Sequence, residues 1–289
     1  MKTWPAPAKL NLFLHVVGRR PDGYHLLQTV FQFLDFADTL RFKVTNDGRI
    51  RRAVELPGVP EETDLTVRAA RLLQQAGANK QGAVIHIDKR IPAGGGLGGG
   101  SSDAATTLLA LNELWGLRLP RAELARLGLT LGADVPVFIF GQAAWAEGVG
   151  EVLSPVKLPE PWYVVLVPPI NVVTAAVFED YAARRDAAPS HEDQAAPQAQ
   201  LTPYTPAITI RDFFAGQGRN DLENVTRCLY PVVGEALDWL GRFGRARMTG
   251  SGGCVFLDVA DQDAAQQILS QVPAPLTGFV ARGMNRHPL

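Results

Sequence analysis

A row of glycines is the feature of this 289-residue chain that most constrains its fold. Residues 94–100 contain six glycines and one leucine, and Ser101, Ser102 and Asp103 follow directly. Glycine leaves backbone N–H groups unshielded and adopts positive φ angles, so successive amides can converge on one anion. A strand-like segment, residues 83–91, precedes the row, and a helical stripe of apolar residues runs from near Ser102 to near Gly116. Because a helix N-terminus also attracts anions, the segment predicts a phosphate-binding loop rather than a flexible linker.

The polar residues after the glycines have alternative roles. Ser101 and Ser102 could cap the helix, and their hydroxyls could contact phosphate oxygens or Mg²⁺. Asp103 is expected in the first turn of the helix, where the helix dipole favours a carboxylate.

Spacing separates three kinds of phosphate loop. The Walker pattern fails because no Gly-Lys-Ser/Thr ends the row. A dinucleotide fingerprint is met at Gly94, Gly96 and Gly99, but any row of glycines meets it, and the acidic residue nearest the required position, Glu113, lies inside the predicted helix. The third pattern, Pro-x-x-x-Gly-Leu-Gly-x-x-Ser-Ser over residues 92–102, resembles the phosphate loop of the GHMP kinases.

The remaining chain mixes strand and helix patterns without an internal repeat or a regular βαβ rhythm. This mixture favours an α+β fold in two layers over a doubly wound sheet. Three prolines in residues 154–162 indicate a domain junction, which gives an N-terminal domain of residues 1–156 and a C-terminal domain of residues 157–289. Residues 187–207, rich in Ala, Pro and Gln, are predicted to form a partly disordered surface excursion.

Four segments extend the resemblance. In order and spacing, residues 7–31, 92–112, 131–151 and 248–257 resemble the 4-diphosphocytidyl-2-C-methyl-D-erythritol kinases within the GHMP superfamily. The resemblance implies a two-domain GHMP kinase fold, with a ribosomal-protein-S5-like βαβ core in the ATP-binding domain and an α/β sandwich in the second. It also implies that ATP phosphorylates the 2-hydroxyl of the diphosphocytidyl alcohol, in non-mevalonate isoprenoid precursor synthesis. One departure is Asp64, where such kinases commonly carry an asparagine near the adenine.

The resemblance assigns the ATP phosphates to the whole glycine loop. Its expected contacts are Pro92, Ala93, Gly94, Gly95, Gly96, Leu97, Gly98, Gly99, Gly100, Ser101 and Ser102.

Transfer of a phosphoryl group to an alcohol needs a proton acceptor and a cation. Asp134 is the expected base. Pro136 is expected to push Val135 out of helical geometry and so to fix the carboxylate in an irregular segment, although Asp134 could instead cap a helix beginning at Val135. Lys9 is the expected cation beside the reacting hydroxyl, with a solvated lysine at a strand end as the alternative.

The family pattern also places the substrate residues. Asn11 shares the strand face of Lys9 and is expected to orient the substrate. Tyr24 and Phe178 are expected to stack on the cytosine, His25 to hydrogen-bond to it, and Thr174 to contact the substrate nearby. Residues 249–253 resemble a third glycine motif bordering the active site, with an ordinary hairpin turn as the alternative.

Composition limits the partners. The net charge of −1 gives no basic field for nucleic acid or anionic lipid. The N-terminal apolar run is too short for a signal peptide or a membrane span, so a cytoplasmic protein is expected, as a monomer or weak homodimer. Mg²⁺ is expected as the counter-ion of ATP, held mostly by phosphate and water, because no acidic cluster identifies a protein ligand. Two other functions stay open: a GHMP kinase of the homoserine or mevalonate type, and a nucleotide sensor without catalysis.

Overall fold

A computed structural model describes residues 1–55, 58–187 and 207–289. The excursion expected at 187–207 lies outside the described residues except for its two ends. The strands are β1 Thr3–Arg19, β2 His25–Thr45, β3 Ile50–Arg52, β4 Gly82–Asp88, β5 Ala144–Glu147, β6 Val152–Pro155, β7 Trp162–Val167, β8 Arg247–Met248, β9 Val255–Val259 and β10 Thr277–Met284. The helices are α1 Leu65–Ala76, α2 Gly99–Leu114, α3 Arg121–Leu129, α4 Val135–Phe140, α5 Thr174–Ala187, α6 Ile210–Phe214, α7 Glu223–Leu229, α8 Pro231–Leu240 and α9 Gln262–Leu269.

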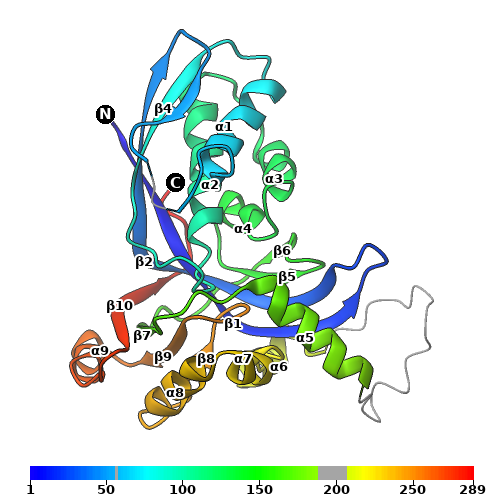
Figure 1. The fold of residues 1–289 in the computed structure, drawn as a ribbon, viewed down its shortest axis with the longest axis vertical. Helices are drawn as coiled ribbons and strands as arrows, with labels where there is room; N and C mark the ends of the chain where they lie inside the picture. The colour runs from blue at the N-terminus through cyan, green and yellow to red at the C-terminus, as the bar shows by residue number, and fades with distance from the viewer. Residues whose placement is uncertain (56–57, 188–206) are drawn as a thin grey trace.

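The long antiparallel hairpin of β1 and β2 runs through the middle of the molecule (Figure 1). Its tip is the Pro-Asp-Gly turn between Arg19 and His25. The register of β1 with β2 shifts after Asn11, and Phe13 joins the core cluster of Leu10 and Leu12. The shift keeps Lys9 and Asn11 together, since it falls beyond both residues.

The described strands form one sheet in the order β3-β4-β2-β10-β7-β9-β8. The last strand, β10, pairs with β2 on one side and with β7 on the other, so it joins the N-terminal strands to the C-terminal strands. On the β2 side, β1 and the β5–β6 pair add to this path. The mixed α+β class is confirmed. The domain boundary at residue 156 stays a prediction.

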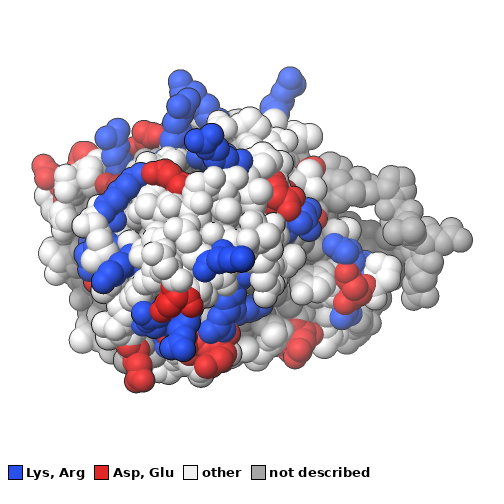
Figure 2. Space-filling view, turned by 90° about the horizontal axis from the view of Figure 1, so that it is seen from above, with Lys and Arg blue, Asp and Glu red and all other residues white. Residues whose placement is uncertain are grey.

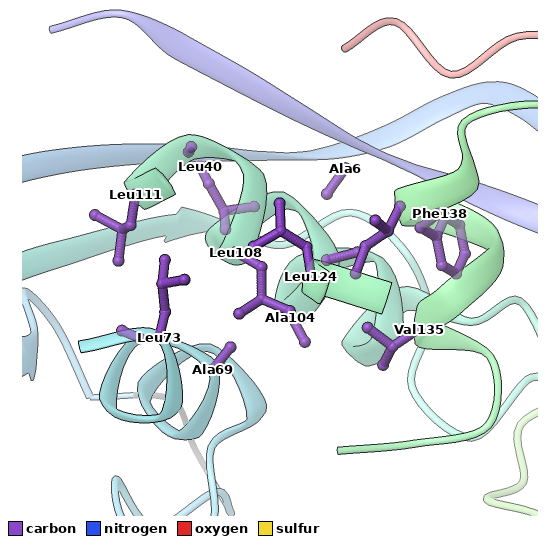
Figure 3. Packing of buried hydrophobic residues seen from close by; sticks show 14 of the residues in the cluster. Ala6, Leu40, Ala69, Leu73, Ala104, Leu108, Leu111, Leu124, Val135 and Phe138 are labelled. Carbon is purple, nitrogen blue, oxygen red and sulfur yellow. The ribbon is translucent and has the colours of Figure 1, made fainter. Parts of the chain in front are cut away.

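Helices α1 to α4 cover the upper part of the β1–β2 hairpin, and Figure 3 shows their apolar side chains pointing toward one another. Ala104, Leu108 and Leu111 of α2 form the centre of this cluster, as their spacing predicts. Leu73 of α1 and Phe138 of α4 pack on the same cluster. This packing fixes α2, whose N-terminus contains the last two glycines of the row, against α4, whose N-terminus follows Asp134.

The C-terminal half packs a second cluster between helices and the strands β7, β8 and β9. A third cluster lies where β1, β2, β7 and β9 meet, and it includes Leu97 of the glycine row and Cys254 beside β9. The glycine row is therefore anchored in the junction between the two halves rather than on the surface of one.

The surface carries charges of both signs. Lys and Arg are interspersed with Asp and Glu over the face shown in Figure 2, which accords with the net charge of −1. In the described parts of the chain, every helix is too short or too polar to cross a membrane.

Candidate active site

The glycine row forms a tight loop whose conformation requires glycine. Gly94, Gly96 and Gly98 have φ angles of +68°, +74° and +72°. A Cβ on Gly96 would lie 2.3 Å from the carbonyl oxygen of Thr249, so a side chain there is excluded by space as well as by φ. Helix α2 begins at Gly99, earlier than expected from the apolar stripe. A Cβ on Gly99 would lie only 3.0 Å from Cγ2 of Ile91, so glycine permits this close approach at the helix start.

The third glycine segment, residues 249–253, packs directly on this loop. The N–H of Cys254 donates to the carbonyl oxygen of Gly95 at 3.0 Å, and the N–H of Asn11 donates to Oγ1 of Thr249 at 2.9 Å. Asn220 holds the turn from behind, since its Nδ2 donates to the carbonyl oxygens of Met248 and Gly250. The segment is a turn between β8 and β9, as expected, and it also forms part of the site's framework.

Lys9 is a buried cation rather than a solvated lysine at a strand end. Its side chain is 2% exposed. Its Nζ lies 3.0 Å from Oδ2 of Asp134, and it donates to the carbonyl oxygen of Gly96 at 3.0 Å and to Oδ1 of Asn11 at 2.5 Å. A buried ammonium group needs such partners because burial removes its water. Lys9 therefore links the strand β1, the glycine loop and Asp134.

Asp134 sits at the N-terminus of α4 in a short non-helical turn, as expected, but the expectation that Pro136 pushes Val135 out of helical geometry is wrong. Val135 is the first residue of the helix and Pro136 lies in its first turn, where proline costs nothing because the N–H groups there have no partner within the helix. Asp134 occupies the N-cap position, yet among the described residues its side chain makes no capping hydrogen bond. The carboxylate is 34% exposed, so it holds Lys9 and still faces solvent.

Asn11 is enclosed in the protein. Its Oδ1 accepts from Lys9 and its Nδ2 donates to Oγ1 of Thr29 at 3.0 Å. The contact with Thr29 fixes the amide so that its oxygen faces Lys9, and a role in holding the substrate stays a prediction.

A cavity of about 390 Å³, here called the loop cavity, lies in front of the glycine loop. The loop forms one wall from Pro92 to Ser101, and Val59 with residues 63–66 lies among the rest of its lining, together with Ile87, Lys89 and Asp103. Ser101 faces it, whereas Ser102 is fully buried and its hydroxyl has no partner within the described chain. Neither serine caps α2, because Gly98 occupies the N-cap position.

A second cavity of about 480 Å³, here called the hairpin cavity, lies beside the tip of the β1–β2 hairpin. Tyr24, His25, Thr174 and Phe178 all line it, so the structure brings together these four expected residues. The rings of His25 and Phe178 are stacked with centroids 5.0 Å apart, while Tyr24 is 64% exposed. Thr174 shares a 2.8 Å hydrogen bond with Ser251 of the third glycine segment.

Burial and nearby positive charge favour the neutral form of the His25 ring. Burial lowers the pKa of His25, and the nearby positive charges of Arg19 and Arg185 lower it further. A neutral imidazole has one donor and one acceptor nitrogen, which suits hydrogen bonding to a polar heterocycle.

Sequence reasoning misassigned Asp103 and missed Lys89 and Asp38. Asp103 lies beyond the first turn of α2, is buried, and pairs with Lys89 at 2.7 Å. Lys89 also pairs with Asp38, whose Oδ1 accepts from the N–H groups of Arg90 and Ile91 at the start of the loop. Burial raises the pKa of Asp103 to about 7, against the opposing charge of Lys89. The position of Lys89 between a strand and the glycine row could have marked it as a candidate site residue. Asp38 lies 51 residues from Lys89, and no sequence pattern indicated that the two would pair.

Comparison with known proteins matches both halves of this arrangement. The models of the GHMP kinases N terminal domain and GHMP kinases C terminal match residues 64–142 and 208–277. The 4-diphosphocytidyl-2-C-methyl-D-erythritol kinase of Thiobacillus denitrificans is 58% identical over 288 residues, covering 100% of this chain and 97% of that protein. The kinase of the same name from Dechloromonas aromatica is 55% identical, covering 99% and 98%.

Solved structures agree. A crystal structure of 4-(cytidine 5'-diphospho)-2C-methyl-D-erythritol kinase matches with a TM-score of 0.79 and 33% identity over 98% of this chain and 99% of that one. The mevalonate kinase of L. major, at 16% identity and a TM-score of 0.67 over 99% and 96% of the two chains, shares the fold. The chain belongs to the 4-diphosphocytidyl-2-C-methyl-D-erythritol kinases of the GHMP kinase superfamily.

Proposed function

We propose that this protein transfers the γ-phosphoryl group of ATP to the 2-hydroxyl of 4-diphosphocytidyl-2-C-methyl-D-erythritol. The observation that carries the proposal is the Lys9–Asp134 pair, 3.0 Å apart, since each partner lies next to a residue that lines one of the two cavities. Lys9 donates to Gly96 of the loop cavity, and Ala133, next to Asp134, lines the hairpin cavity. A phosphoryl donor in one cavity and an alcohol in the other would meet at this pair.

Asp134 acts as the general base. Its carboxylate accepts the proton of the attacking hydroxyl while a new O–P bond forms and the bond from the γ-phosphorus to the β–γ bridging oxygen breaks, so that ADP leaves. Lys9 stabilises the negative charge that spreads over the transferring group, and its buried position makes this interaction stronger than it would be in water.

The glycine loop binds the phosphates of ATP. Backbone N–H groups of the residues that line the loop cavity and the N-terminus of α2 together supply donors and positive partial charge. Mg²⁺ would neutralise phosphate charge in the transfer. The part of the chain that the structure describes holds no cluster of three His, Cys, Asp or Glu residues that could bind a metal ion. The Ser101 hydroxyl lies close to the segment of Asp134, since a Cβ built on Gly132 would be 3.7 Å from it. Ser101 therefore offers a hard oxygen ligand at this place. We therefore assign Mg²⁺ to phosphate, water and Ser101.

The hairpin cavity takes the cytidine end of the acceptor. Tyr24 and Phe178 supply ring faces for the base, His25 supplies a donor and an acceptor, and Thr174 a hydroxyl. A cytoplasmic location and a monomeric or weakly dimeric state stay predictions from the sequence.

An acceptor panel tests the proposal. ATP is supplied with the diphosphocytidyl alcohol, with mevalonate or with homoserine, and ADP release is followed in a coupled assay. Rapid release with the cytidine-containing alcohol alone is expected. Preference for a cytidine-free alcohol would assign a different GHMP kinase activity, and ATP binding without transfer to any alcohol would indicate a sensor.

A further inference from the structure

A buried ion pair lies behind one wall of the loop cavity. Nη1 of Arg52, at the end of β3, is 3.1 Å from Oδ2 of Asp64, and the two side chains are only 6% and 5% exposed. The Arg52 guanidinium also donates from Nη2 to the carbonyl oxygen of Val59 at 2.8 Å, and its backbone N–H donates to Oε2 of Glu61 at 3.0 Å. Arg52 thus holds the segment before α1 at Val59, Glu61 and Asp64.

The carboxylate of Asp64 is fully engaged within the protein. Oδ1 accepts from the N–H and the hydroxyl of Thr66 at 2.7 and 2.6 Å and from the N–H of Val67 at 3.4 Å, which caps helix α1. Oδ2 is the atom that faces Arg52. Asp64 therefore fixes the backbone at the start of α1, and both of its carboxylate oxygens are hydrogen-bonded within the protein.

This anchored segment is part of the lining of the loop cavity. Val59 and residues 63–66 line the cavity together with the glycine loop. A Cβ on Gly100 would lie 3.3 Å from Cδ1 of Leu65, so the start of α1 packs closely on the start of α2. Arg52 itself lies outside the lining of this cavity and borders a separate surface hollow with Glu55 and Glu62.

We propose that Arg52 is a positioning residue for nucleotide binding: the Arg52–Asp64 pair holds Val59 and residues 63–66 in place as the wall that receives the nucleoside of ATP. Breaking a buried ion pair leaves an uncompensated charge, which the segment relieves by moving. A moved wall weakens ATP binding without altering the acceptor site, because the hairpin cavity shares none of these lining residues. The proposal rests on the ATP-dependent function proposed above.

The test separates ATP affinity from the acceptor. Calorimetry gives the Kd for ATP, and steady-state kinetics gives the KM for the diphosphocytidyl alcohol, at a temperature where thermal unfolding shows each variant folded. Arg52→Met, which keeps much of the aliphatic stem, is expected to raise the Kd for ATP by about tenfold or more. The KM for the acceptor is expected to stay within about twofold. Arg41→Met is the matched control, because Arg41 pairs with Asp88 on the same sheet with side chains that are 35% and 58% exposed.

Two further variants complete the test. Arg52→Lys keeps the charge but has one ammonium group for two partners, so its Kd for ATP is expected between those of wild type and Arg52→Met, and it replaces Arg52→Met if that variant does not fold. The double variant Asp64→Asn, Arg52→Met is expected to bind ATP no more weakly than the single variant with the lower ATP affinity, because both changes break the same Arg52–Asp64 contact. Folded Arg52 variants that bind ATP like wild type, or that lose acceptor and ATP affinity equally, would overturn the proposal. Absence of ATP binding by the wild type would instead overturn the proposed function.

Discussion

Asp134→Asn is the substitution that most directly separates catalysis from folding. Asparagine keeps the shape of the side chain and an oxygen that Lys9 can reach, but it cannot accept a proton from an alcohol. Lys9 also retains Oδ1 of Asn11 and the carbonyl oxygen of Gly96. Because the carboxylate is 34% exposed and caps no helix among the described residues, its replacement leaves the fold intact.

The expected effect on rate is far larger than the effect on stability. A positioned general base contributes about 10²- to 10⁴-fold, which corresponds to about 2.7–5.4 kcal/mol of activation free energy. Loss of one hydrogen bond to a charged group costs less than about 2–3 kcal/mol of unfolding free energy. The variant is therefore expected to stay folded, with a denaturant midpoint lowered by no more than this loss of unfolding free energy, and to bind ATP, while its kcat falls by at least about 10²-fold.

Initial rates of ADP release at saturating ATP and acceptor measure kcat, and urea unfolding measures stability. Glu113→Gln is the control, because it makes the same chemical change in an exposed pair, Lys2–Glu113, at 2.9 Å. A kcat for Asp134→Asn within about threefold of that of the control would refute the assignment of Asp134 as the base.

Three other predictions test the framework. Gly96→Ala and Gly116→Ala both place a side chain at positive φ, at a cost of about 1–2 kcal/mol, but only the Cβ at position 96 meets an atom, the carbonyl oxygen of Thr249 at 2.3 Å. Thermal unfolding and ATP titration should show a larger loss of stability and of ATP affinity for Gly96→Ala. Equal losses in the two variants would contradict the role of the loop. The pKa of Asp103 is about 7 in the folded chain against an ordinary 3.8, so between these pH values the folded chain holds a proton that the unfolded chain has lost, and stability falls as the pH rises. Asp103→Asn removes this fall, so urea unfolding should show its stability relative to wild type rising from pH 5 to pH 7, and a constant difference would contradict the raised pKa. Phe178→Ala should weaken acceptor binding by about 1–3 kcal/mol and leave the Kd for ATP unchanged, and an unchanged KM for the acceptor would remove Phe178 from the site.

Local patterns were sufficient to predict many elements. The apolar stripe after the glycine row predicted helix α2 and its end near Gly116, and the turn between β8 and β9 followed from its glycines. The start of α4 was mispredicted, because the effect of proline on the preceding residue was weighed above its compatibility with a first helical turn. The start of α2 was placed too late, because Gly99 and Gly100 gave no helical signal although the packing admits them there.

Long-range pairing limited what could be inferred about the site. Lys9 and Asp134 were proposed from the family pattern, and their 3.0 Å contact depends on how β1 packs against α4 through α2. Asp103 pairs with Lys89, and Asp64 pairs with Arg52, which ends the three-residue edge strand β3. No local pattern predicts such pairs, because the two residues are brought together only by the sheet and by helix packing.

The products of the wild-type reaction show whether the γ-phosphoryl group of ATP reaches the 2-hydroxyl of the acceptor. The wild-type protein is incubated with ATP, Mg²⁺ and 4-diphosphocytidyl-2-C-methyl-D-erythritol, and the products are identified by phosphorus NMR. The presence or absence of coupling between the new phosphorus signal and carbon-bound protons identifies the hydroxyl that carries the phosphate. The account predicts ADP together with an equal amount of a new phosphomonoester on the 2-hydroxyl, and neither product with Asp134→Asn on the same time scale. ADP without a phosphorylated acceptor, or a phosphate on another hydroxyl, would contradict it.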